Sequence, residues 1–149
     1  MIDISEFENH LKKIPATDWE ELFKLNEQLK QASSFGKMKG GEKIEENVST
    51  FPYLEQSKLT RQFVRFLYDK NIIPSFDWME WQEGKELLRQ KDPNFNNLDT
   101  ITLCKLLTAI IRADRFSDGT LIGMMKEGVI QRIVDGIQGN YEKNNPSQR

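Results

Sequence analysis

The chain has 149 residues, of which 38% are apolar and 30% charged, and its 21 basic and 23 acidic side chains give a formal net charge of −2. This length suits one domain with a single hydrophobic core. The balanced charge lacks the basic excess of most nucleic-acid-binding proteins, and the one cysteine excludes an internal disulfide and a cysteine-rich zinc site. The acidic N-terminal segment shows no apolar signal region, so we expect a cytoplasmic protein without a membrane anchor.

Two short amphipathic helices are expected to open the chain. Ser5 and Glu8 fit a capping box for the first helix, which Pro15 ends. Thr17 and Glu20 fit a second capping box, followed by apolar residues at helical spacing.

Residues 33–56 lose this periodicity. They hold three glycines and three lysines close together, namely Gly36, Gly40, Gly41, Lys37, Lys39 and Lys43. The spacing is not that of a phosphate-binding loop. We therefore expect a long glycine-rich loop or a weak hairpin, which is either mobile or covers a functional surface.

A third helix is expected to begin at Ser57 and to end near Asn71. Its bases Lys58, Arg61 and Arg65 share one face, which is most often a solvated face. Together with the loop lysines they are also the residues through which nucleic acid would bind, and such binding would depend steeply on salt.

The next helix is expected to follow Asp77 as its cap, with Glu80 completing a capping box. Phe76 should pack on Trp81 as a hydrophobic staple. Trp78 and Trp81 lie one turn apart, so they form either a core anchor or a ring-lined groove.

The longest apolar run, residues 98–112, predicts a buried central helix capped by Asp99 and too short to span a bilayer. Cys104 in its middle is interpreted as a buried hydrophobic residue, since the only histidine, His10, lies far away in sequence. We interpret His10 as a partly exposed structural residue, because no second ligand accompanies it.

A charged turn, RADRF, follows the central helix, and Ser117 or Asp118 should cap a short helix that Gly128 ends. A last helix should run to Ile137. The predicted fold is all-α, a single compact bundle of six or seven non-parallel helices over residues 1–137, with residues 138–149 as a polar, disordered tail.

Two sets of residues could carry function. The predicted binding residues have the types that dominate protein interfaces and include both arginines of the charged turn: Trp78, Trp81, Arg112, Asp114 and Arg115. The alternative for this turn is a structural arginine–carboxylate clasp to the Asp77 region or the first helices. A second set of carboxylates, with Glu83 and Asp118 nearby, could share a magnesium-like ion: Asp77, Glu80 and Asp114. Capping and helix-dipole effects explain Asp77 and Glu80 without a metal.

The segments FDWMEWQEG, LCKLLTAIIRADRFSDG and GVIQRIVDGI resemble a family of small prokaryotic proteins defined as a domain of unknown function. The resemblance runs from Phe51 to Ile137. Its motifs are FDW at residues 76–78 and Arg-x-x-Arg-Phe-x-x-Gly at residues 112–119. It implies a bacterial or archaeal source and a small helical domain, and it implies no activity or catalytic residue.

We therefore predict a small protein-interaction or regulatory module that binds another protein or a second copy of itself, without a cofactor. The binding surface is expected where the Trp78 segment, the RADRF turn and the glycine-rich stretch meet. The alternative is an enzyme that depends on a metal or an anion and uses the region of Asp77, Glu80, Asp114 and Arg115.

Overall fold

The computed structural model describes residues 4–41, 43–46, 48–49 and 51–144. Within these ranges the elements are α1 (Ile4–Lys13), α2 (Ala16–Gln31), β1 (Gly36–Lys39), β2 (Lys43–Glu45), β3 (Val48–Ser49), β4 (Tyr53–Gln56), α3 (Lys58–Asp69), the 3-10 turn η1 (Trp78–Glu80), α4 (Gln82–Arg89), the 3-10 turn η2 (Phe95–Asn97), α5 (Thr100–Ala113), α6 (Thr120–Lys126) and α7 (Val129–Asn144). The described chain is thus a bundle of seven helices with one hairpin, as predicted. None of the helices in these ranges is long and apolar enough to cross a membrane.

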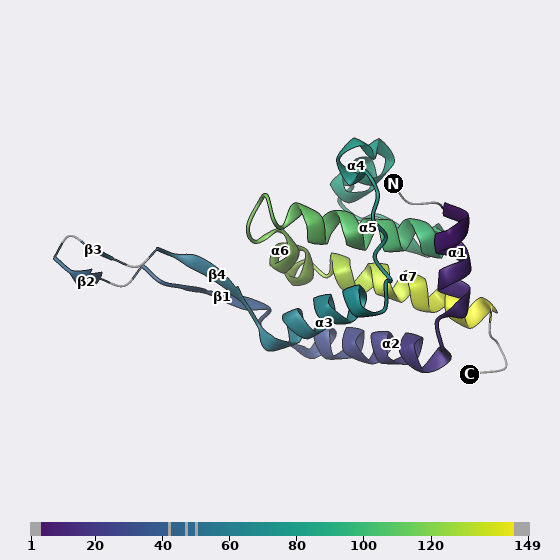
Figure 1. Ribbon diagram of the computed structural model, residues 1–149, viewed down its shortest axis with the longest axis horizontal. Helices are drawn as coiled ribbons and strands as arrows, with labels where there is room; N and C mark the ends of the chain where they lie inside the picture. The colour runs from purple at the N-terminus through teal and green to yellow at the C-terminus, as the bar shows by residue number, and fades with distance from the viewer. Residues whose placement is uncertain (1–3, 42, 47, 50, 145–149) are drawn as a thin grey trace.

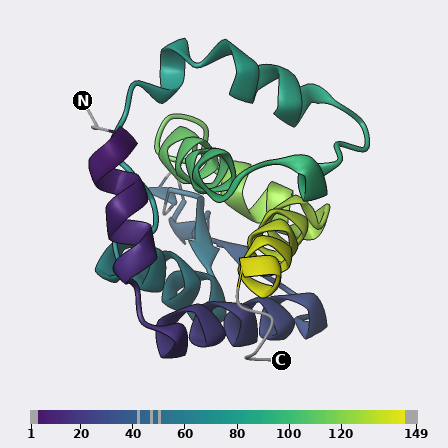
Figure 2. The ribbon, with the colours of Figure 1, turned by 90° about the vertical axis from the view of Figure 1, so that its right-hand side faces the viewer.

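Helix α5 lies at the centre of the helical body and packs against α7 and α6 (Figures 1 and 2). It buries eight side chains, Leu103, Cys104, Leu106, Leu107, Thr108, Ala109, Ile110 and Ile111. Asp99 caps it as predicted, because its Oδ1 accepts the N–H of Thr102 at 2.8 Å. Cys104 is fully buried, and burial raises the pKa of its thiol.

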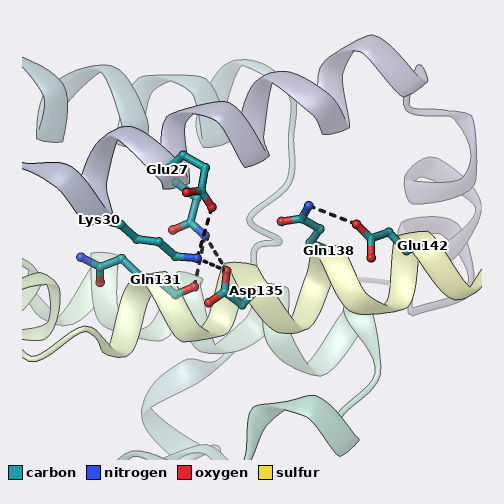
Figure 3. A network of polar contacts seen from close by, with 7 residues as sticks. Glu27, Lys30, Gln131, Asp135, Gln138 and Glu142 are labelled. Carbon is teal, nitrogen blue, oxygen red and sulfur yellow. Dashed lines mark hydrogen bonds and ion pairs between the residues drawn. The ribbon is translucent and has the colours of Figure 1, made fainter. Parts of the chain in front are cut away.

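Helix α7 is the second central element and packs against α2 as well as α5. A polar network with Glu27, Lys30 and Asp135 crosses the α2–α7 contact (Figure 3). Asn26, also at this contact, is fully buried. Its Nδ2 donates to the carbonyl of Gln131 at 3.3 Å and to Oδ1 of Asp135 at 3.0 Å. Lys30 donates to the same Asp135 oxygen at 2.8 Å, and this bond raises the pKa of Lys30. These contacts hold the two helices in one register.

The glycine-rich stretch forms an arm, residues 36–56, that projects away from the helices (Figure 1). Strands β1 and β4 pair antiparallel over Gly36–Lys39 and Tyr53–Gln56, and β2 pairs with β3 further out. Gly40 has a φ of +80°, and a Cβ there would lie 2.2 Å from the carbonyl oxygen of Phe51, so only glycine fits this close crossing. The predicted weak hairpin is therefore an extended arm.

Several helix ends differ from those predicted. Helix α2 begins directly after Pro15, whose φ of −60° suits a helix start, so Thr17 lies inside the first turn instead of capping it. Helix α1 begins at Ile4, so Ser5 is helical as well, and residues 1–3 lie outside the described part. Helix α7 continues past Ile137 to Asn144, which corrects the predicted helix end; residues 145–149 of the expected tail lie outside the described ranges.

The helix predicted after Asp77 is also different. The chain forms η1, leaves the helical conformation at Trp81 and then starts α4. The Asp77 side chain makes no capping bond. The break places the Trp81 ring directly over Gly84, where a Cβ would clash with the ring. The staple contact itself is confirmed, because Phe76 and Trp81 meet edge to face at 5.5 Å between ring centroids.

Three local predictions agree with the structure. Ser57 caps α3 by accepting the N–H of Thr60 at 3.1 Å. Asn71, with a φ of +54°, and Gly128, with a φ of +80°, adopt the left-handed conformation that ends α3 and α6. His10 is half-buried, and its Nε2 lies 3.1 Å from the carbonyl oxygen of Lys70, which fits a structural role.

Candidate functional site

The RADRF turn is organised by the carboxylate of Asp114. Its Oδ1 accepts the N–H groups of Gly119 at 3.2 Å and Leu121 at 3.0 Å, so Asp114 caps α6 from the end of α5. Its Oδ2 accepts the amide of Gln56 at 3.4 Å, which ties the base of the arm to the same turn. The caps predicted at Ser117 and Asp118 are wrong, because Gly119, with a φ of +96°, takes the cap position.

The two arginines of the turn do not form the arginine–carboxylate clasp. Arg112 is half-buried, and its guanidinium lies 5.5 Å from the centroid of the Tyr68 ring, a cation–π contact. Arg115 is exposed, and its guanidinium makes no hydrogen bond or ion pair with a described residue. The turn is held by Asp114 and backbone N–H groups, which leaves Arg115 available to a partner.

The two tryptophans have separate environments, because the helix is broken between them. The Trp78 ring lies 6.1 Å from the ring of Phe116, so η1 packs beside the RADRF turn. The Trp81 ring packs on Phe76, and the ammonium of Lys105 lies 4.4 Å from its centroid. Trp78 therefore joins the charged turn, whereas Trp81 packs against the flank of α5.

The predicted carboxylate set is not assembled into a metal site. Within the described residues, no group of three or more histidine, cysteine, aspartate or glutamate side chains is placed to hold a metal ion. Asp77 and Glu80 are exposed, and the oxygens of Asp114 are directed at the N–H donors described above.

The arm base brings together the three segments that the sequence singled out. Trp78 contacts Phe116, and Gln56 at the end of β4 contacts Asp114. We call the surface formed by Trp78, Met79, Arg115 and Phe116 the arm-base surface. Phe116 is 74% exposed and Met79 is 47% exposed. The three segments therefore lie close together, and that they form a binding surface stays a prediction.

Exposed apolar side chains continue from this surface along the arm. Seven large hydrophobic residues are exposed in the described part of the chain. Four of them lie on the arm, namely Met38, Val48, Phe51 and Tyr53; Phe116 lies in the RADRF turn and Met79 in η1. Phe51 has the highest exposure, 90%. Sequence reasoning missed the arm residues, although the apolar run Phe51-Pro52-Tyr53 inside a charged stretch was a signal for them.

Ion pairs hold the inner part of the arm. Glu55 lies 2.6 Å from the ammonium of Lys39 and 3.8 Å from the guanidinium of Arg61. The bond to Lys39 lowers the pKa of Glu55 and raises that of Lys39. Leu54 on the other face of the strand packs next to Gly119 of the turn. The charged face of the arm is therefore internally paired, whereas Met38 on the opposite face is 64% exposed.

Two hollows lie outside the arm-base surface. One of about 650 Å³ lies between α1, α2, α5 and α7 and is lined by Leu11, Trp19, Ile101 and Tyr141 among others. The other, of about 910 Å³, runs between the end of α2, the segment after α4 and the α6–α7 junction. We call this second hollow the α6–α7 groove.

Comparison with protein families identifies the chain. A model described as a family of unknown function, DUF6508, matches residues 14–143. The chain belongs to this family. DUF6508 extends over α2 and the arm, so it covers more of the chain than the resemblance from Phe51 to Ile137. The two motifs and the prokaryotic source remain predictions. No curated protein and no solved structure matches the chain.

Proposed function

We propose that this protein is a cytoplasmic interaction module of a prokaryote that acts by binding, and that it binds a second copy of itself through the arm and the arm-base surface. One observation carries the proposal: of the seven exposed large hydrophobic side chains in the described chain, four lie on the arm and a fifth, Phe116, lies in the RADRF turn that contacts the arm. Apolar side chains gathered in this way typically mark interaction sites.

The form of the arm supports a protein partner. A two-stranded hairpin on its own is marginally stable in water, and its outer edges offer unpaired backbone N–H and C=O groups. Strands β1 and β4 pair only with each other among the described strands. A second extended chain would pair these groups and would lie next to Met38 along the edge of β1 or next to Tyr53 along the edge of β4.

The charge of the arm supports a second copy as that partner. Residues 36–56 contain three lysines and four glutamates, so two arms can lie together without strong repulsion. A contact between equivalent surfaces is also the commonest interface in oligomers, since two-fold symmetry places each arm against its counterpart. The exposed Arg115 then lies at the rim of the contact, where arginine is enriched.

Sedimentation velocity across a hundredfold range of protein concentration tests the proposal. We expect a dimer with twice the 17.5 kDa mass of the chain. The double variant Met38→Ser/Phe51→Ser should be monomeric, whereas Ile4→Ser, at an exposed apolar position on α1, should remain dimeric. A wild-type protein that is monomeric at every concentration, or an arm variant that still dimerises, would overturn the proposal.

A further inference from the structure

The charge of the α6–α7 groove differs from that of the whole chain. The groove is lined by five basic side chains and only two acidic ones, Glu127 and Asp135, although the chain as a whole has a net charge of −2. Lys30 pairs with Asp135, and Arg132 pairs with Asp92 at 2.6 Å. The remaining three bases, Arg89, Lys91 and Lys126, form no ion pair with a described residue. The lining of the groove therefore has a net positive charge.

Buried polar atoms beside these bases also lack partners. Four buried side-chain nitrogen or oxygen atoms have no hydrogen-bond partner in the described chain, and two of them, Gln131 Oε1 and Arg132 Nε, belong to neighbouring residues that line the groove. Gln131 is only 6% exposed. Its Nε2 donates to the carbonyl of Met125 at 3.0 Å. The atom without a partner is therefore the amide oxygen, which can only accept a hydrogen bond. Buried polar atoms are nearly always hydrogen-bonded, so these two atoms can bond to a ligand in the groove.

The start of α7 adds to this arrangement. The N–H of Arg132 donates to the carbonyl of Gly128 at 3.1 Å, so the N–H groups of the preceding turn have no acceptor within the helix. Gly128 and Val129 line the groove, which places the positive end of a long helix next to the unpaired bases.

We propose that the α6–α7 groove binds a nucleotide. The phosphates would be bound by Arg89, Lys91 and Lys126 and by the start of α7. Arg132 Nε needs an acceptor such as a phosphate oxygen, whereas Gln131 Oε1 needs a donor such as a sugar hydroxyl. The half-buried side chains Leu88, Met124 and Val129 give the groove an apolar wall against which a base can lie. A volume of about 910 Å³ lies within the range of small-molecule sites and is larger than a bare phosphate requires.

Isothermal titration with ATP, without added metal, tests the proposal. We expect saturable binding, and we expect the Kd to rise at least tenfold in Lys126→Glu and in Arg89→Glu. Both side chains are exposed, so both variants should fold. The matched control is Lys58→Glu, an exposed base on α3 outside the groove, which should bind ATP as the wild type does.

Two further titrations separate a nucleotide site from a general attraction of anions. Inorganic pyrophosphate lacks the sugar and the base, and adenosine lacks the phosphates, so each should bind at least tenfold more weakly than ATP. No heat with ATP at 1 mM, equal losses in Lys58→Glu and Lys126→Glu, or pyrophosphate binding as tight as that of ATP would each overturn the proposal. The groove lies at the end of α6, whereas the RADRF turn precedes its start, so loss of ATP binding and loss of dimerisation can be observed independently.

Discussion

The bond network of Asp114 gives the sharpest test of how the arm base is held. Asp114→Ala removes the acceptor for two backbone N–H groups at the start of α6 and for the amide of Gln56. Loss of a helix cap costs about 0.5–2 kcal/mol, and hydrogen bonds to a charged group are worth about 1.5–3 kcal/mol each. Because Asp114 is only half-buried, we expect a loss of about 2 kcal/mol in the free energy of unfolding.

Two further variants isolate the cause. Asp114→Asn keeps a neutral acceptor and should lose about half as much, about 1 kcal/mol. Asp118→Ala removes an exposed carboxylate of the same turn that makes no hydrogen bond to a described residue, so it should change stability by less than about 0.5 kcal/mol.

Urea unfolding followed by circular dichroism measures these differences, provided that the slope of the free energy of unfolding against urea concentration is the same in each variant. In a domain of this size, 2 kcal/mol corresponds to a fall in Tm of about 4–8 °C. If Asp114→Ala were as stable as Asp118→Ala, the carboxylate would not cap α6, and the argument that the RADRF turn is structural at Asp114 would fail.

Three other outcomes are expected. Asn26→Asp should lower the free energy of unfolding by about 3 kcal/mol, because it replaces the buried donor to Asp135 with a carboxylate. Comparison with Asn26→Ala in urea unfolding would isolate the effect of the added charge. Cys104 should not react with a thiol reagent at pH 8 until the protein unfolds, since burial raises its pKa and blocks access; labelling at the native rate of a free thiol would contradict this. Asp135 raises the pKa of Lys30 above its ordinary value of 10.5, so this stabilisation should be complete below that pH and lost as pH rises through the folded pKa. Wild type should be more stable than Lys30→Met by less than about 1 kcal/mol, because the pair is exposed. This difference in the free energy of unfolding should shrink from pH 9 to pH 11.5. A difference that stays constant would show that the ion pair is not its source.

Some helix ends that depend on neighbouring residues were predictable from the sequence. Asp99 and Ser57 each accept an N–H three residues further on, and Asn71 and Gly128 adopt the left-handed conformation suited to a helix end. The central helix was predictable for a related reason, because an apolar run without a polar face has to be buried.

The failures come from competing contacts that a cap or capping-box pattern does not rank. Ser117 and Asp118 are good caps by type, yet Asp114 reaches across the turn and takes that role. The predicted helix after Asp77 breaks because Trp81 packs over Gly84 while Trp78 packs on Phe116. No local pattern ranks such packing arrangements against helix propensity.

The candidate site was predicted in part. The meeting of the Trp78 segment, the RADRF turn and the glycine-rich stretch was expected, and the structure places these three together. That Arg112 contacts Tyr68 and that Arg115 stays free depends on helix packing, which spacing alone does not give. The apolar surface of the arm was missed because short strands with few alternating residues give a weak signal.

The arm leaves the helices through a narrow neck. The carbonyl of Phe35 accepts both the N–H of Ser57 at 2.8 Å and the hydroxyl of Thr60 at 2.9 Å, so the two ends of the arm are joined within the body. Leu54 is the one residue of the described strands that packs against the hydrophobic core, so we expect the arm to open separately from the core. Amide hydrogens of β1 and β4 should exchange through local opening, whereas those of α5 should exchange only when the whole protein unfolds. The hairpin between Phe35 and Ser57 should also tolerate a change in length without a change in the core.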